Sequence, residues 1–450
     1  MSLLTPMLRS SPLTDWFSDA QRVQGMLDFE AALAQAQADC GLVPQAAVSP
    51  IVNACRHALI DFDALGQAAA SAGNLAIPLV KQLTARVKAQ DPDAARYVHW
   101  GATSQDAIDT GFVLQLRGAL AATDSLLQSL IDAFAEQAQR YQHTVMPGRT
   151  WMQHALPVTF GLKLAGTLDA LLRWQQRLIE MRPRVLALQF GGAAGTLDSL
   201  KKQAPQVAQS LAQTLDLQLP DTPWHSQRDR FLEVGAWFAG VCGTLGKFAN
   251  DFSLLMQTEV AEVGEPLAEG RGGSSTMPHK RNPVSCAAIL TAAQRTPGLV
   301  ATLYAGQIQQ HERALGGWQA EWETLPELIM LVGGALAQTD MLVREMQVFV
   351  HKMRADLDIT HGLIMAEAVT LALAEFIGKA EAHHRVEALC RQALDRNGLL
   401  VDLLAADPLV SQYLSRERLS ALLDPATATG SAERFVRQVL ARYQEQHHES

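Results

Sequence analysis

The chain has 450 residues, of which 48% are hydrophobic and 18% charged, and its formal net charge is −9 at pH 7. This length exceeds one compact core of usual size, so we expect two or three domains. The negative charge argues against a general nucleic-acid binder and against a binder of acidic membranes. An anionic substrate would therefore need a positive site that is built locally. We find no run of about eighteen apolar residues that would predict a membrane span.

The cysteines and the N-terminus indicate the compartment. The five cysteines are scattered and have no metal-ligand spacing, so we expect reduced thiols and no metal (Cys40, Cys55, Cys242, Cys286 and Cys390). The first residues lack the basic segment followed by an apolar one that marks a secretory signal. We therefore predict a cytoplasmic protein.

Long helical patterns occupy the middle of the chain. Apolar residues recur at steps of three and four, as in helices that pack in a bundle, in five stretches (116–138, 159–181, 230–257, 284–310 and 328–353). Alternating strand patterns are scarce. We therefore predict an all-α fold with a central bundle of five long helices.

Turn-forming residues break both ends of the chain into shorter helical segments. On this basis we predict three domains. An N-terminal helical domain covers residues 1–110, the long-helix bundle covers 111–354, and a C-terminal helical domain covers 355–450.

The segment 264–283, GEPLAEGRGGSSTMPHKRNP, is a polar and glycine-rich loop that cannot hold a helix. Asn282 favours an N-cap and Pro283 a first helical residue, so a helix should begin at Val284. The positive end of that helix, together with two cations in the loop, predicts an anion site. The alternative is an ordinary exposed loop before a capped helix.

Hydroxyl groups on this loop could transfer a proton once the loop closes and excludes water. The string GSSTMPHKRNP resembles the signature of the fumarase/aspartase lyase superfamily. The resemblance implies that Ser274 is the base that takes the proton α to a carboxylate, with Ser275 as the less favoured candidate. It also implies that Lys280 and Asn282 hold the substrate and stabilise its aci-carboxylate form.

The string HWGATSQD, which begins at His99, resembles the first conserved block of the same superfamily. The resemblance implies that the hydroxyls of Thr103 and Ser104 bind a substrate carboxylate, with His99 beside them. Gln105 stands where many members have Asn or Ser. Read without the resemblance, Thr103 and Asp106 would form a helix cap.

The string GRTWMQ resembles the second block, which places Arg149, Trp151 and Gln153 at the substrate. Most members have a histidine at position 151 that assists the leaving group. A carboxylate has a pKa of about 4 and leaves without a proton, so a tryptophan favours a reaction in which a carboxylate adds or leaves. Members of this kind are cycloisomerases that lactonise carboxylated muconates. The alternative is that Trp151 packs in the core and His154 or His99 supplies the acid.

The segment that begins at His311 resembles a His-Glu-Arg-Asp stretch of adenylosuccinate lyases, in which the arginine grips a phosphate. The serines that follow in those enzymes are replaced here by Gly316, Gly317 and Trp318. We therefore expect Arg313 to hold an additional carboxylate. The alternative is a solvated helix face.

The segment 191–196 is expected as a loop near the substrate, and the segment 225–230 resembles another stretch of the superfamily that lies near the site. The glycine-rich 191–196 segment is not followed by a strand–helix unit, which excludes a dinucleotide-binding fold.

The resemblance as a whole implies a lactonising enzyme for a small polycarboxylate, without cofactor or metal. It also implies a homotetramer in which each site is shared between subunits, with no nucleic-acid or membrane partner. The competing interpretations are a fumarate-releasing lyase such as adenylosuccinate lyase, and an inactive scaffolding protein that keeps the fold. Intact Ser274, Lys280 and Asn282 argue against the scaffolding protein.

Overall fold

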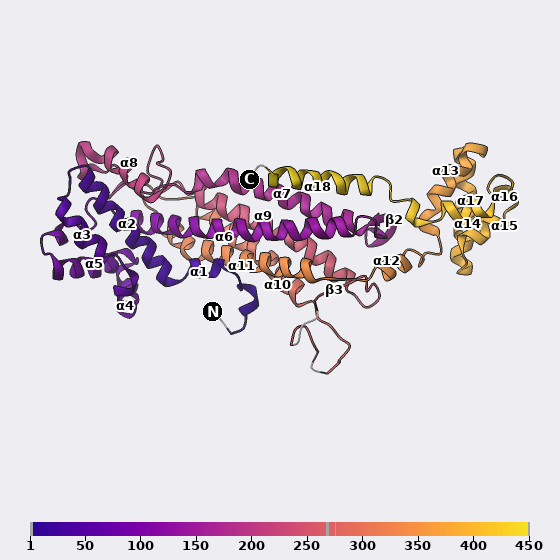
Figure 1. Cartoon of the computed structure of the whole chain (residues 1–450), viewed down its shortest axis with the longest axis horizontal. Coiled ribbons are helices and arrows are strands. Elements are labelled where there is room, and N and C mark those ends of the chain that lie inside the picture. Colours follow the sequence, from indigo (N-terminus) through magenta and orange to yellow (C-terminus); the bar gives the residue numbers. More distant parts are fainter. Residues whose placement is uncertain (1–2, 267–269, 275, 449–450) are drawn as a thin grey trace. The chain divides into compact units, whose positions relative to one another are not determined.

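The computed structural model describes residues 3–266, 270–274 and 276–448 (Figure 1). The chain divides into two compact units. Unit 1 comprises Met1–Gln128, Arg173–Gly246 and Ala288–Gln338, and unit 2 comprises Ser129–Leu172, Lys247–Ala287 and Thr339–Ser450. The predicted three-domain division follows successive chain segments instead, and it stays a prediction.

The fold is all-α, as predicted, and the five long helices are present. They are α6 (Ser104–Arg140), α7 (Phe160–Val185), α9 (Asp229–Leu255), α10 (Val284–Ala305) and α11 (Gly317–Glu345). Their buried faces are apolar at helical spacing, which is the pattern that predicted them. Helix α10 begins at Val284, as the sequence predicts.

The last predicted helix is wrong at its C-terminal end, because α11 stops at Glu345 rather than near residue 353. The next residues form β4 (Gln347–Val348), which pairs antiparallel with β3 (Val263–Gly264), and helix α12 (Val350–Asp356) follows. The Phe349 N–H donates to the Glu262 carbonyl oxygen at 2.9 Å. This pairing with a distant segment overrides the local helical pattern.

Besides segments of the long helices, unit 1 contains further helices. They are η1 (Pro6–Leu8), α1 (Leu13–Trp16), α2 (Asp19–Asp39), α3 (Gln45–Ala54), η2 (His57–Leu59), α4 (Phe62–Ala72), α5 (Ala76–Gln90), η3 (Ala94–Tyr97), η4 (Asp198–Gln203) and α8 (Ala204–Leu215). Helices α2 and α6 cross at a glycine pair, where a Cβ on Gly25 would lie 2.5 Å from the Gly111 carbonyl oxygen. Larger residues there would force α2 and α6 apart.

Unit 2 holds a hairpin and the C-terminal helices. Besides β3, β4 and α12, its elements are β1 (Val145–Thr150), β2 (Gln153–Thr159), η5 (Leu363–Met365), α13 (Ala366–Ile377), α14 (Lys379–Arg396), α15 (Leu400–Ala406), α16 (Pro408–Tyr413), α17 (Arg416–Leu422), η6 (Pro425–Thr427) and α18 (Ala432–His448). Strands β1 and β2 pair antiparallel. The short helices α13 to α17 bury a shared apolar cluster that includes Val369, Leu389 and Leu404.

Helix α11 is long and apolar enough to cross a membrane by length and composition, which the sequence analysis did not anticipate. Within the described chain, 67% of its apolar window is buried. Burial of this extent is typical of a core helix of a globular unit.

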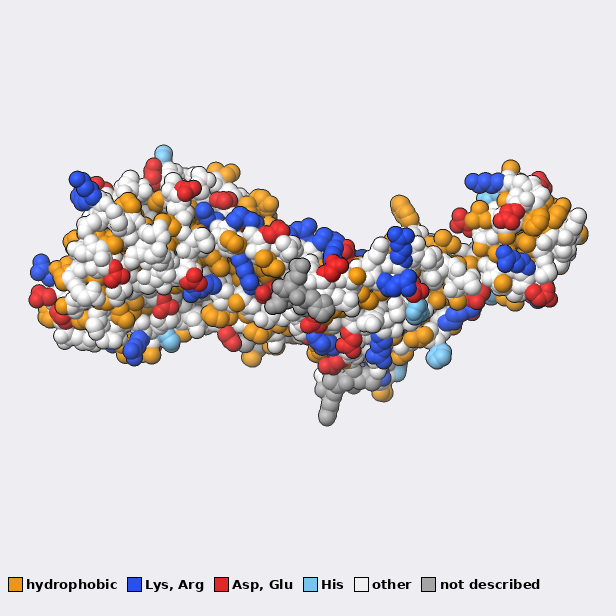
Figure 2. Space-filling model, turned by 45° about the horizontal axis from the view of Figure 1, so that its top comes forward, with side chains coloured by type: hydrophobic (Ala, Val, Ile, Leu, Met, Phe, Trp, Pro, Cys, Tyr) orange, Lys and Arg blue, Asp and Glu red, His pale blue; other side chains and the backbone are white. Residues whose placement is uncertain are grey.

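Basic and acidic side chains are interspersed on the face of the molecule that Figure 2 shows. Several form ion pairs one helical turn apart, such as Arg354 with Asp358 and Arg391 with Glu387. Exposed pairs of this kind are screened by solvent and contribute little to stability. The stability of the fold therefore depends on the buried helix faces.

Candidate active site

Asp106, in the first turn of α6, is a fully buried carboxylate that collects four donors in unit 1. Its Oδ1 accepts the Gly191 N–H at 3.0 Å and lies 2.7 Å from His225 Nε2. Its Oδ2 accepts the N–H groups of Gly192 at 2.9 Å and Thr103 at 3.0 Å. The predicted cap between Thr103 and Asp106 is therefore present. The same carboxylate also holds the 191–196 segment and the 225–230 segment against the block that begins at His99.

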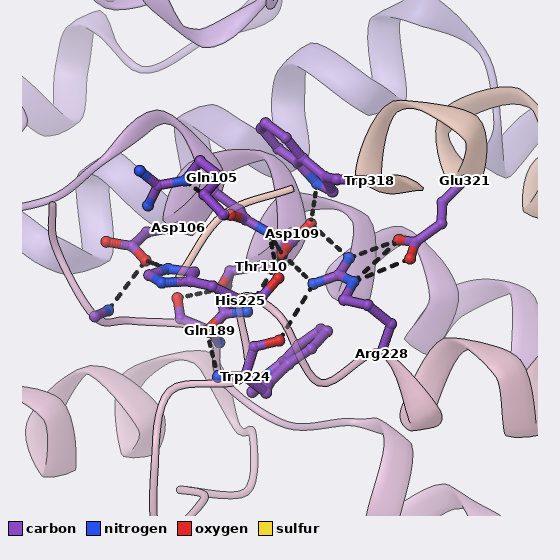
Figure 3. A network of polar contacts seen from close by, with 12 residues as sticks. Gln105, Asp106, Asp109, Thr110, Gln189, Trp224, His225, Arg228, Trp318 and Glu321 are labelled. Atoms are coloured by element: carbon purple, nitrogen blue, oxygen red, sulfur yellow. Dashed lines mark hydrogen bonds and ion pairs between the residues drawn. The ribbon is translucent and has the colours of Figure 1, made fainter. Parts of the chain in front are cut away.

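A second buried acid, Asp109, lies one turn further along α6 and pairs with the fully buried Arg228 (Figure 3). Arg228 Nη1 donates to Asp109 Oδ2 at 2.6 Å, and its Nη2 donates to Glu321 Oε2 at 2.7 Å. Burial lowers the pKa of Arg228, but the two carboxylates outweigh burial and raise it. This guanidinium is saturated by protein groups, so it joins α6 to α11 rather than serving a substrate.

Arg313 lies in the turn before α11, so the alternative of a solvated helix face is wrong. Its Nε donates to Gln105 Oε1 at 2.9 Å and its Nη1 donates to the Ala193 carbonyl oxygen at 3.0 Å. Its Nη2 is buried and has no hydrogen-bond partner in the described part of the chain. Neutral groups thus orient the guanidinium and leave one donor for an anion. Gln105 departs from the common Asn or Ser and reaches Arg313.

Thr103 and Ser104 lie at the N-terminus of α6 and are half-buried. Among the described residues, no hydrogen bond of either hydroxyl is present, while the Thr103 N–H is held by Asp106. A helix N-terminus favours negative charge, so two free hydroxyls there suit a carboxylate.

His99 stands beside this helix end and pairs with an acid that the sequence analysis missed. Its Nδ1 lies 2.6 Å from Oε1 of Glu30 on α2, and Glu30 is only 2% exposed. The φ of His99 is +58°, in the left-handed region that non-glycine residues rarely adopt. Burial lowers the pKa of His99, but the charge and hydrogen bond of Glu30, with the charge of Asp106, outweigh burial and raise it.

The second block forms the β1–β2 hairpin of unit 2, with Trp151 and Met152 as its turn. Trp151 is 97% exposed in the chain, so the alternative that it packs in the core is wrong. Both turn residues have positive φ, +51° and +64°, which a two-residue hairpin turn requires and non-glycine residues resist. Gln153, just past the turn, is also exposed.

Arg149, on β1, is engaged by a buried acid. Its guanidinium donates twice to Glu262, at 2.9 and 2.8 Å, and the Glu262 side chain is 0% exposed. Burial raises the pKa of Glu262, Arg149 opposes this, and the nearby Asp356 adds to the increase. Burial and Arg149 lower the pKa of His154, which favours a neutral ring and makes it a poor proton donor.

The loop that carries Ser274 turns tightly around its hydroxyl. Ser274 Oγ accepts the N–H of Thr276 at 3.4 Å and that of Met277 at 3.1 Å. Donors aimed at an oxygen stabilise its ionised form, so this turn favours a serine alkoxide. Ser275 lies outside the described residues.

The other predicted loop residues follow directly. The Lys280 N–H donates to the Met277 carbonyl oxygen at 3.0 Å, and the Lys280 side chain is exposed. The Asn282 N–H donates to the Gly272 carbonyl oxygen at 2.8 Å, next to a bridge between Gly273 and Arg281. These contacts draw the two sides of the loop together.

The N-terminus of α10 differs from the prediction. Glu265 Oε2 accepts the Ser285 N–H at 3.0 Å and Oε1 accepts the Cys286 N–H at 2.9 Å. A buried protein carboxylate therefore caps this helix, rather than Asn282. The predicted anion site at the helix end is wrong in this respect, because two of its N–H donors are already taken.

The predicted residues are divided between the two units. Unit 1 contains His99, Thr103, Ser104 and Arg313, and unit 2 contains Arg149, Trp151, Gln153, Ser274, Lys280 and Asn282. Within unit 1, His99 and Asp106 interact electrostatically, and Gln105 joins the first block to Arg313.

The buried acids that pair with these residues were not predicted from the sequence. Glu30 interrupts an apolar face of α2 that includes Met26, Leu27 and Leu33, and a charge at such a position is a detectable signal. Glu262 and Glu265 lie in a non-helical segment, where no periodic pattern exposes them.

Comparison with known proteins gives matches along nearly the whole chain. A family described as lyase matches residues 8–298, and one described as adenylosuccinate lyase C-terminus matches residues 362–439. A Pseudomonas aeruginosa protein named 3-carboxy-cis,cis-muconate cycloisomerase is 56% identical over 434 residues, which cover 96% of this chain and 95% of that protein.

A solved structure and a more distant relative extend this likeness. The crystal structure of 3-carboxy-cis,cis-muconate lactonizing enzyme from Pseudomonas putida matches with a TM-score of 0.94 and 50% identity, covering 98% of this chain and 99% of that one. Trans-aconitate decarboxylase 1 of Mycosarcoma maydis is 39% identical over 438 residues, covering 97% of this chain and 87% of that protein.

Proposed function

The chain belongs to the lyase family, and we propose that it is a 3-carboxy-cis,cis-muconate cycloisomerase, which closes 3-carboxy-cis,cis-muconate to 4-carboxymuconolactone. This reaction belongs to the breakdown of aromatic compounds through protocatechuate. The proposal is supported by relatives of that name that match the chain over nearly its full length.

The residue at position 151 carries the proposal. Trp151 replaces the histidine that most superfamily members use to protonate a leaving group, and its ring has no acidic proton to offer. In lactonisation the group that adds is a carboxylate of the substrate, which needs no proton at neutral pH. His154 is a poor substitute acid because its pKa is lowered.

The proposed reaction starts within the substrate. A carboxylate oxygen attacks the conjugated diene and forms the new C–O bond, while the π electrons move onto a second carboxylate as an aci-carboxylate. Because nucleophile and diene belong to one molecule, holding them in a near-attack conformation supplies much of the rate enhancement. His99, Thr103, Ser104 and Arg313, with Arg149, Trp151 and Gln153, are the proposed binding residues.

Ser274 then delivers a proton to the α-carbon, which returns the electron pair from the aci-carboxylate to carbon. The serine alkoxide that remains is stabilised by the N–H groups of Thr276 and Met277 and regains its proton from water. Lys280 and Asn282 stabilise the negative charge of the intermediate. No cofactor takes part in this scheme, and Ser275 is the second candidate for the proton donor.

The quaternary structure belongs to the proposal as well. Each unit of one chain carries only part of the predicted set. A homotetramer with shared sites, which the superfamily resemblance implies, would combine residues from different copies. A cytoplasmic location is part of the same proposal and is consistent with five free cysteines.

The test is a spectrophotometric assay with 3-carboxy-cis,cis-muconate, because lactonisation destroys the absorbing diene. We expect the absorbance to fall with wild-type protein and Ser274→Ala to lower kcat at least about a thousandfold. His279→Gln, an exposed change in the same loop, is the matched control. Fumarate release from adenylosuccinate without loss of the diene would refute the proposal.

Sharing of sites has a separate test. Light scattering should report four chains per particle. Mixed tetramers of Ser274→Ala and Thr103→Val chains should regain part of the activity that each variant lacks, because some sites would then receive both wild-type residues. A mixture that stays inactive would exclude a site built from several copies.

A further inference from the structure

Helix α2 presents a buried carboxylate to the first conserved block. Glu30 is 2% exposed, and its Oε1 lies 2.6 Å from His99 Nδ1. A second contact from the same helix, Gln37 Nε2 to the Trp100 carbonyl oxygen at 2.6 Å, fixes the next residue of the block. The crossing of α2 and α6 at Gly25 sets the position of the acid.

The local backbone shows that His99 is held and not merely packed. Its φ is +58°, a conformation that costs energy in a non-glycine residue and persists only where the surrounding structure holds it. The ring is half-buried, with its side chain 18% exposed. Nδ1 is used by Glu30, and Nε2 has no hydrogen bond among the described residues.

The charges around the ring favour its protonated form. Two groups face His99 electrostatically, Glu30 from α2 and Asp106 from α6, and both are acids. Burial alone would lower the pKa of His99, but the two acids outweigh burial and raise this pKa. A histidine with a raised pKa is charged over a wider pH range, which suits the binding of an anion.

We infer that Glu30 is a positioning residue of the site: its buried carboxylate holds His99 as an imidazolium whose free Nε2–H donates to a carboxylate of the substrate. This inference rests on the proposed function for the identity of that carboxylate. It assigns His99 to binding, and it leaves Ser274 as the group that moves the proton.

The first experiment is an NMR titration of the full chain labelled with ¹³C at histidine Cε1, with His99→Asn to assign the signal. In wild type, the His99 signal should titrate above the ordinary value of 6.5. In Glu30→Gln it should titrate at lower pH than in wild type. Asp39→Asn removes an exposed carboxylate from the same helix and should leave the signal unchanged.

The second experiment links this titration to the reaction. At a pH where only wild-type His99 is charged, Glu30→Gln should raise KM for 3-carboxy-cis,cis-muconate about tenfold or more with little change in kcat, because a charge-assisted hydrogen bond is lost. As the pH rises, the kcat/KM of Glu30→Gln should begin to fall at a lower pH than the kcat/KM of wild type. Asp39→Asn should match wild type in both measurements.

Two results would overturn the inference. One is a wild-type His99 that titrates below 6.5, which needs no variant and remains available if Glu30→Gln does not fold. The other is a His99 titration that shifts in Glu30→Gln while KM and the pH profile do not change. An enzyme that fails to lactonise the muconate would refute the proposed function, and the titration would still decide whether Glu30 controls the charge of His99.

Discussion

Arg149 and Glu262 form two parallel hydrogen bonds, Nη1 to Oε2 at 2.9 Å and Nη2 to Oε1 at 2.8 Å. They join the hairpin that presents Trp151 to Glu262, which precedes β3 and the loop that carries Ser274. The Glu262 carbonyl oxygen also accepts the Phe349 N–H at the start of α12. One buried acid thus connects three segments of unit 2.

Replacing Glu262 with Gln should destabilise unit 2. The change removes the charge partner of Arg149 and leaves a cation whose side chain is only 21% exposed. Loss of one partner from a fully buried pair costs about 3–5 kcal/mol, and partial exposure of Arg149 reduces this to about 2 kcal/mol. The midpoint of urea unfolding measures the effect. Glu259→Gln, an exposed change three residues earlier, should leave the midpoint where it is.

The kinetic constants of Glu262→Gln and Arg149→Met separate two roles for Arg149. If Arg149 only supports the hairpin, Arg149→Met and Glu262→Gln should change KM and kcat alike. If Arg149 also holds a substrate carboxylate, Arg149→Met should raise KM about tenfold beyond Glu262→Gln. Equal kinetic constants in the two variants would remove Arg149 from the binding set.

Glu265→Ala should release the start of α10. The change frees the N–H groups of Ser285 and Cys286, and loss of such a cap costs about 0.5–2 kcal/mol. Hydrogen exchange at these two amides should accelerate, and kcat should fall because the loop that carries Ser274 loses its fixed end. Unchanged protection of both amides would show that Glu265 does not cap the helix in solution.

The sequence predicts the long helices well because their apolar stripes are local and repeat over many turns. It fails at residues 346–349, where pairing of β4 with β3 depends on a segment more than eighty residues away. The β1–β2 hairpin was not predicted, since its turn is Trp151–Met152 rather than a glycine-containing pair.

The candidate site residues differ in the same way, because some belong to a local motif and others depend on a distant partner. Ser274, Lys280 and Asn282 could be proposed from the sequence because their motif is contiguous. Glu30 and Glu262 act on residues that lie 69 and 113 positions away, so no local pattern could pair them with His99 and Arg149. A contiguous motif can be recognised from the sequence, whereas an ion pair between distant residues requires the structure.

Arg228→Met should be the most destabilising single change in unit 1. It would leave Asp109 and Glu321 buried without a counter-charge, and removal of one member of a buried ionic group costs about 3–5 kcal/mol. Urea unfolding provides the measurement, with Arg230→Met as the neighbouring control. If the cause is uncompensated charge, adding Asp109→Asn and Glu321→Gln should recover much of the loss. No recovery would point to packing instead.

The ion pair of His99 and Glu30 should make stability depend on pH in a defined direction. The pKa of His99 is raised in the folded chain above its ordinary value of 6.5, so the folded state binds the proton more tightly than the unfolded state. The stabilisation is therefore fully present below pH 6.5 and is lost as the pH rises through the raised pKa. The difference in Tm between wild type and His99→Asn, followed from about pH 5.5 to 9, should shrink towards alkaline pH. A difference that grows with pH would mean that His99 is neutral in the folded protein, and Glu30 would then have to act on the site without charging the ring.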